Sequence, residues 1–148
     1  LDAKSGLARA HCAEALIFMG KTGEALKELQ SARDLEDDGG VAEFAYRLTI
    51  FAGISDLERA LKETNDKKRG EKFDFAIKAF QLAAKFEPKA AEPRLRIGEV
   101  HVLTGKNAEA KAEIDAALKL TPNDDEKALA DKLLEVASGK VKAAPKKR

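Results

Sequence analysis

The chain has 148 residues, of which 44% are hydrophobic, so it is long enough to form one domain with a continuous core. Aromatic residues make up only 5% and prolines number four, while Ala, Leu, Glu and Lys dominate, which predicts an all-α fold with small residues at close helix contacts. The single cysteine excludes an intrachain disulfide and a thiolate metal site. No apolar run approaches the roughly 20 residues that span a bilayer. We expect a cytoplasmic protein, and the alternative is a protein with a targeting segment upstream of Leu1.

Residues 6–38 predict a first unit of two helices joined by a turn. Gly20 is expected to end the first helix. The second helix carries small and apolar residues at positions i, i+4 and i+7, which lie on one stripe. The residues of this pattern are Cys12, Ala13, Leu16, Gly20, Ala25, Leu29 and Ala32. Because Cys12 occupies an apolar core position, we expect its thiol to be buried and inert.

The middle of the chain, residues 39–89, has an irregular pattern. Residues 39–66 predict a second unit, in which Gly53 ends the first helix and Ser55 caps the next. Residues 65–72 form a polar connection that we expect to be the flexible point. Residues 70–89 predict only the second helix of a unit, with Ala76, Phe80, Ala83 and Pro88. The interval from Gly53 to Gly70 is only half of a repeat, which predicts either a deleted helix or a long, kinked helix here.

Residues 91–124 form the clearest unit. They carry Ile97, Gly98, Gly105, Ala110, Ile114, Ala117 and Pro122 in the same order as the first unit. Gly105 is expected to end the first helix and Pro122 to stop the second. A last helix over 124–137, with Leu129, Leu133, Leu134 and Val136, has no following partner helix.

The unit at 91–124 resembles a tetratricopeptide repeat. The resemblance implies that residues 1–138 form a right-handed α-solenoid of helix hairpins, with 124–137 as a capping helix. It also implies a non-enzymatic scaffold or adaptor, which binds a protein or peptide partner in a concave groove lined by the first helix of each unit.

Groove positions carried over from the family include two aligned glutamates, Glu14 and Glu99. We expect a partner with apolar and basic residues, although two solvated glutamates are the alternative. Members of the family that clamp a chaperone's C-terminal carboxylate have Lys and Asn where this chain has Ala10 with Glu14 and Leu95 with Glu99, so that clamp is not expected. The groove positions are Ala10, Glu14, Ile17, Ala42, Tyr46, Thr49, Leu95, Glu99 and Val102.

No catalytic motif is present in the sequence. The two histidines, His11 and His101, lie in different units, and no nucleophile, base and orienting group can be assembled around either. No glycine-rich phosphate loop is present. We therefore expect no enzymatic activity, no cofactor and no metal site.

The C-terminal tail, residues 139–148, is strongly basic. The whole chain carries a net charge of +1 and the tail carries five positive charges, so the remaining residues carry −4. This composition is typical of a disordered segment that aids solubility. The alternative function is recruitment to an acidic polymer, such as RNA or a negatively charged filament or cytoskeletal surface. The basic residues are Lys140, Lys142, Lys146, Lys147 and Arg148.

Overall fold

The computed structural model describes residues 5–35 and 39–140, and within them it contains seven α-helices and no strand. The prediction of an all-α fold is therefore confirmed for this part of the chain. The helices are α1 (Gly6–Phe18), α2 (Thr22–Leu35), α3 (Gly39–Lys62), α4 (Asp66–Phe86), α5 (Glu92–Leu103), α6 (Asn107–Leu118) and α7 (Asp124–Ala137).

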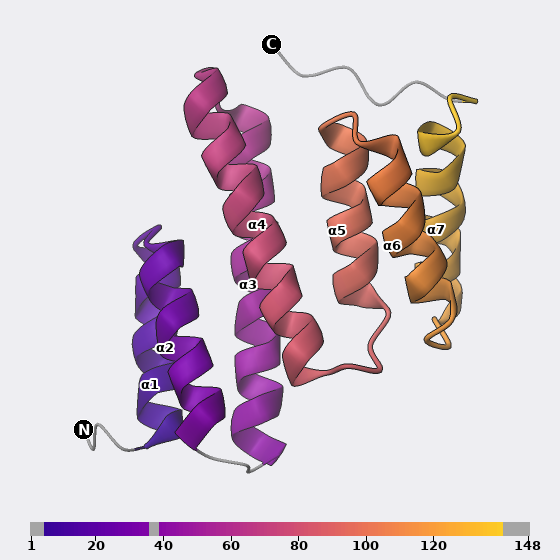
Figure 1. The fold of residues 1–148 in the computed structure, drawn as a ribbon. Coiled ribbons are helices and arrows are strands. Elements are labelled where there is room, and N and C mark those ends of the chain that lie inside the picture. Colours follow the sequence, from indigo (N-terminus) through magenta and orange to yellow (C-terminus); the bar gives the residue numbers. More distant parts are fainter. Residues whose placement is uncertain (1–4, 36–38, 141–148) are drawn as a thin grey trace.

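The helices run alternately up and down and form a row of three hairpins followed by α7 (Figure 1). Partners within each hairpin pack together, and the contacts between hairpins join helices that are one or two places apart in the chain, such as α1 with α3, α4 with α5, and α5 with α7. The α1–α2 hairpin and α7 lie at opposite ends of the row. Stacking of neighbours therefore builds the fold.

Three helix ends share one turn structure. Gly20 and Gly105 both have a φ of +74°, and Gly139, after α7, has a φ of +77°. Such a positive φ is adopted readily by glycine because it lacks a Cβ. In each turn the amide of the following lysine donates to a carbonyl five residues back: Lys21 to Leu16 (2.9 Å), Lys106 to His101 (2.8 Å) and Lys140 to Glu135 (3.0 Å). The helix ends predicted at Gly20 and Gly105 are confirmed.

The predicted boundaries in the middle of the chain are wrong. The α3 helix continues through Gly53 and Ser55 and has 24 residues, and α4 begins at Asp66, so most of residues 65–72 are helical. Asn65 caps α4, because its side chain accepts a hydrogen bond from the amide of Lys68 (3.0 Å). The sequence predicted either a deleted helix or a long, kinked helix in this region, and the structure has two long helices, α3 with 24 residues and α4 with 21, which pack as one hairpin.

The core consists of three clusters that span the hairpins. The first cluster contains residues of all four helices from α1 through α4. The second contains residues of α3, α4 and α5, and the third contains residues of α5, α6 and α7. The predicted stripes of the second helices, Ala25, Leu29 and Ala32 in α2 and Ala110, Ile114 and Ala117 in α6, are all buried. A Cβ added to Gly98 would lie 2.9 Å from Ile114, so α5 and α6 approach closely there.

The prediction of a buried Cys12 is wrong, because this residue is exposed. Its counterpart on α5, Ile97, is buried in the cluster that α4 shares with α5. In the described part of the chain no helix precedes α1, so the same face of α1 has no neighbour to cover it.

Candidate functional site

The structure separates the predicted groove residues into buried and accessible ones. Ala10, Ile17 and Leu95 are at most 1% exposed and Val102 is 7% exposed, and all four belong to the core clusters. Thr49 is also buried, with its hydroxyl donating to the carbonyl of Tyr46 (2.7 Å). The half-buried members are Ala42, Glu14, Tyr46 and Glu99. A partner on this face would therefore meet mainly a phenol and carboxylates.

Glu14 and Glu99 have equivalent local partners. Glu14 lies 3.3 Å from Nδ1 of His11, and Glu99 accepts from Nη1 of Arg96 at 3.0 Å. The partner is in each case the residue three places earlier, so His11 and Arg96 also occupy matching places in their two units. Arg96 also lies within reach of Glu92, with 3.6 Å between Nε and Oε1. The two glutamates thus occupy equivalent places on α1 and α5.

A second equivalence was missed by the sequence analysis. Arg9 on α1 pairs with Glu28 on α2 at 3.0 Å, and Arg94 on α5 pairs with Glu113 on α6 at 3.1 Å. The two pairs have the same spacing along the chain and stand at matching positions of their units. This repeated spacing of opposite charges was the signal that could have predicted a bridge between the helices of a hairpin.

Tyr46 on α3 lies in an acidic environment. Its pKa is raised to about 12, mainly by burial and in smaller part by the negative charges of Glu92, Glu126 and Glu87. These carboxylates come from α5, from α7 and from the connection after α4. Negative charge from three separate segments thus converges on one half-buried phenol, which sequence spacing alone did not predict.

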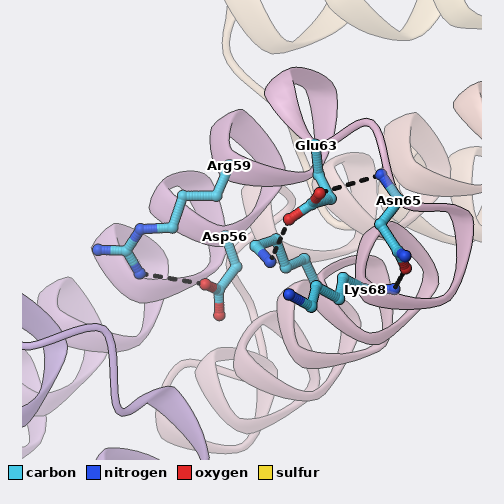
Figure 2. A network of polar contacts seen from close by, with 6 residues as sticks. Asp56, Arg59, Glu63, Asn65 and Lys68 are labelled. Atoms are coloured by element: carbon cyan, nitrogen blue, oxygen red, sulfur yellow. Dashed lines mark hydrogen bonds and ion pairs between the residues drawn. The ribbon is translucent and has the colours of Figure 1, made fainter.

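A cavity of about 570 Å³ with a mixed polar and apolar lining lies where the α1–α2 turn meets the α3–α4 hairpin. On its α3 side, Asp56 accepts from Arg59, with 3.2 Å between Oδ1 and Nη1 (Figure 2). Nearby, Glu63 accepts from the amide of Asn65 (3.0 Å) and from the ammonium of Lys72 (3.1 Å). The bond from the Asn65 backbone is the main reason that the pKa of Glu63 lies below its ordinary value.

Other predicted site residues do not come together. His11 on α1 contacts the ring of Phe44, with 5.1 Å between ring centroids, whereas His101 lies on α5 in another hairpin. Among the residues that the structure describes, no three His, Cys, Asp or Glu side chains are grouped so that they could hold a metal ion. Within residues 5–35 and 39–140, no helix has both the length and the apolar character needed to cross a bilayer.

Most of the predicted basic tail lies outside the described residues, namely Lys142, Lys146, Lys147 and Arg148. Lys140 is exposed, and its backbone amide belongs to the turn that follows α7. Comparison with known proteins finds no family model that matches this chain and no curated protein that matches its sequence.

Proposed function

We propose that this protein is a non-enzymatic scaffold that binds a protein or peptide segment along the face formed by its odd-numbered helices. The observation that carries the proposal is the acidic surrounding of Tyr46, to which α5, α7 and the connection after α4 each contribute a carboxylate. A surface that gathers charge from several repeats favours a ligand that spans those repeats.

Internal equivalence supports a tetratricopeptide-like repeat architecture for this scaffold. The α1–α2 and α5–α6 hairpins share their glycine turn and their Arg–Glu bridge. We propose that the hairpins stack as a right-handed solenoid and that α7 caps it. In support, α7 exposes Asp131 and Lys132 at the places where α5, one repeat earlier, buries Ile97 and Gly98. A polar outer face suits the last helix of a stack.

The chemistry of this face favours a basic partner segment. Tyr46 offers an aromatic ring, and its neighbouring carboxylates attract a cation, so a Lys or Arg side chain would gain both charge attraction and a ring contact. Glu14 and Glu99 would meet further basic residues, because each is accessible and pairs with a single positively charged or titratable side chain in the described residues. We therefore propose a partner that carries Lys or Arg between apolar residues.

The test uses Tyr46 as a reporter, because the chain has one tyrosine and no tryptophan. Tyrosine fluorescence is followed while an alternating Leu-Lys peptide or a Leu-Glu peptide is added. We expect saturable binding of the Leu-Lys peptide only. The double variant Glu14→Lys/Glu99→Lys should weaken that binding by about 2–5 kcal/mol, while Asp115→Lys on α6, exposed and remote from Tyr46 in the chain, should bind normally.

The melting temperature of each variant is measured in parallel, because surface substitutions usually change stability by no more than about 0.5 kcal/mol. A double variant that melts normally and binds the Leu-Lys peptide as well as the parent protein would contradict the proposed groove.

Recruitment through the basic tail is the second candidate function, and the observation behind it is the separation of charge between the tail and the remaining residues. Its test is the deletion of residues 141–148, which removes four of the five tail charges and retains the Gly139 turn. Binding of polyuridylate should fall on deletion and should weaken steeply with added salt. Unchanged binding at low salt would contradict recruitment by the tail.

A further inference from the structure

The α3–α4 hairpin is longer than the α1–α2 hairpin, and its tip extends past the α1–α2 turn (Figure 1). The cavity of about 570 Å³ lies at this step. Residues 18–24 of the turn line one side, Asp56 and Arg59 of α3 line another, and residues of α4 between Lys68 and Phe75 complete it. Its size is within the range of pockets that bind small ligands or side chains.

Two buried polar atoms in this lining have no hydrogen-bond partner: Oδ2 of Asp56 and Oγ1 of Thr22. Asp56 is 4% exposed and Thr22 is 3% exposed. Arg59 contacts only the other oxygen of Asp56, and Figure 2 shows no contact at Oδ2. Buried polar groups are almost always hydrogen-bonded, and both of these atoms belong to residues that line one cavity, so a group bound there could supply the missing hydrogen-bond donors.

A second cavity in the protein can be compared with this one. The start of α6 also borders a cavity, of about 660 Å³, that α7 and the turn after it complete. Asn107 occupies the position equivalent to Thr22 there, and it is exposed. None of the buried unpartnered side-chain atoms in the described residues belongs to that second cavity. Two further buried atoms without a hydrogen-bond partner, Nε of Arg96 and Nδ1 of His101, lie on α5 and line neither cavity, so of the two only the cavity at the first step combines such atoms with an open volume.

The charges of the lining restrict the ligand. Four cationic side chains, Lys21, Arg59, Lys68 and Lys72, face three carboxylates, Glu24, Asp56 and Glu71. Glu63, outside the lining, pairs with Lys72 at 3.1 Å, so a cationic ligand would meet no excess negative charge, and a carboxylate ligand would leave Oδ2 of Asp56 without a donor. A neutral primary amide avoids both problems, since its NH₂ group donates twice and its carbonyl accepts.

Lys68 provides the donor for such a carbonyl. Its ammonium takes part in none of the ion pairs that α4 forms within the described residues, and Figure 2 shows its side chain directed from α4 toward Asp56. We propose that the cavity binds the side chain of a Gln or Asn from a partner segment, with the NH₂ group donating to Asp56 and Thr22 and the carbonyl accepting from Lys68.

The rim of the cavity indicates which kind of residue flanks the Gln or Asn in the partner segment. Phe18 is 71% exposed and Met19 is 65% exposed, and the Phe18 ring lies 5.7 Å from that of Phe51. Apolar side chains flanking the Gln or Asn would remove this surface from water. The partner segment is thus an amide residue between apolar residues, and its site is separate from the carboxylates around Tyr46.

The experiment compares three blocked tripeptides, acetyl-Leu-Gln-Leu-amide and the same peptide with Lys or Glu at the centre, by following backbone amide resonances of the isotope-labelled full chain. We expect the Gln peptide to shift the resonances of Thr22, Gly23 and Asp56 saturably, and to bind at least about tenfold more tightly than either other peptide. Preference for the Lys peptide, equal binding of all three, or no shift at these residues would each overturn the proposal.

Two nearly isosteric variants test the assigned atoms. Thr22→Val removes the hydroxyl, and Asp56→Asn removes the carboxylate. Each variant should bind the Gln peptide at least about tenfold more weakly than the parent protein does. Asp115→Asn is the matched control, because it makes the same carboxyl-to-amide change on an exposed site of α6. If Asp56→Asn does not fold, Thr22→Val decides alone. The double variant Glu14→Lys/Glu99→Lys should bind the Gln peptide as tightly as the parent protein does, which distinguishes this site from the groove proposed above.

Discussion

Gly53 in the middle of α3 lies directly against the ring of Phe80 in α4. A Cβ built on Gly53 would come within 2.8 Å or less of three ring carbons, Cδ1, Cε1 and Cζ. Phe80 is among the largest side chains that are fully buried in the described residues. The glycine therefore permits the close approach of the two longest helices and does not end a helix.

We expect Gly53→Ala to destabilise the protein by roughly 1–3 kcal/mol, because the added methyl group would displace a buried ring. Gly70→Ala is the matched variant, since Gly70 lies in α4 with no atom within 4 Å of an added Cβ. That change should stabilise by about 0.5–1 kcal/mol. Thermal unfolding measures both, and a parent-like melting temperature for Gly53→Ala would contradict the packing described here.

Replacing the small buried residues on the second helix of a hairpin by larger ones should destabilise the protein. Ala25→Phe in α2 and Ala110→Phe in α6 place a ring at fully buried positions, and each should cost roughly 1–3 kcal/mol or more. Ala112→Phe serves as the control because Ala112 is exposed on α6. Denaturant unfolding of the three variants should rank the control as the most stable, and equal stability would show that these alanines are not close contacts.

The phenol of Tyr46 should titrate at high pH and should make stability depend on pH. Its folded pKa of about 12 lies above the ordinary value of 10.0, so the folded protein holds this proton more tightly than the unfolded chain. The resulting stability is complete below pH 10 and is lost as the pH rises toward 12. Ultraviolet absorbance of the phenolate follows the titration directly, because Tyr46 is the only tyrosine.

The double variant Glu92→Gln/Glu126→Gln should lower the pKa of Tyr46, because two of the negative charges that raise it are removed. It should remain above the ordinary value, since burial is the larger cause. A pKa unchanged by the double substitution would mean that the carboxylates do not surround this phenol.

Cys12 should react with a maleimide in the folded protein without denaturant, because its side chain is exposed on α1. Mass spectrometry of the native protein should show one added label, at a rate close to that of the unfolded chain. Modification only after denaturant is added would place a further segment of the protein over this face of α1.

Local patterns in the sequence predicted much of the helix arrangement. The last helix was expected at 124–137 and is observed at Asp124–Ala137, where Asn123 and Glu126 form a reciprocal capping box. The glycines at 20 and 105 ended helices as expected, since a turn with positive φ depends on one residue and its immediate neighbours. Stripes such as Ala110, Ile114 and Ala117 predicted buried faces because a helix repeats about every 3.6 residues.

What the sequence left undecided depended on residues distant in the chain. Gly53 has the local appearance of a helix end, and only the ring of Phe80 on the following helix shows that it lies within a helix contact. The exposure of Cys12 and the burial of Leu95 follow from which face of each helix has a neighbour. The sequence by itself thus determined the helices and their apolar stripes, through short-range periodicity and backbone geometry. The tertiary structure alone decided which surfaces are covered and which polar groups meet, because packing between hairpins brings together side chains that no local pattern links.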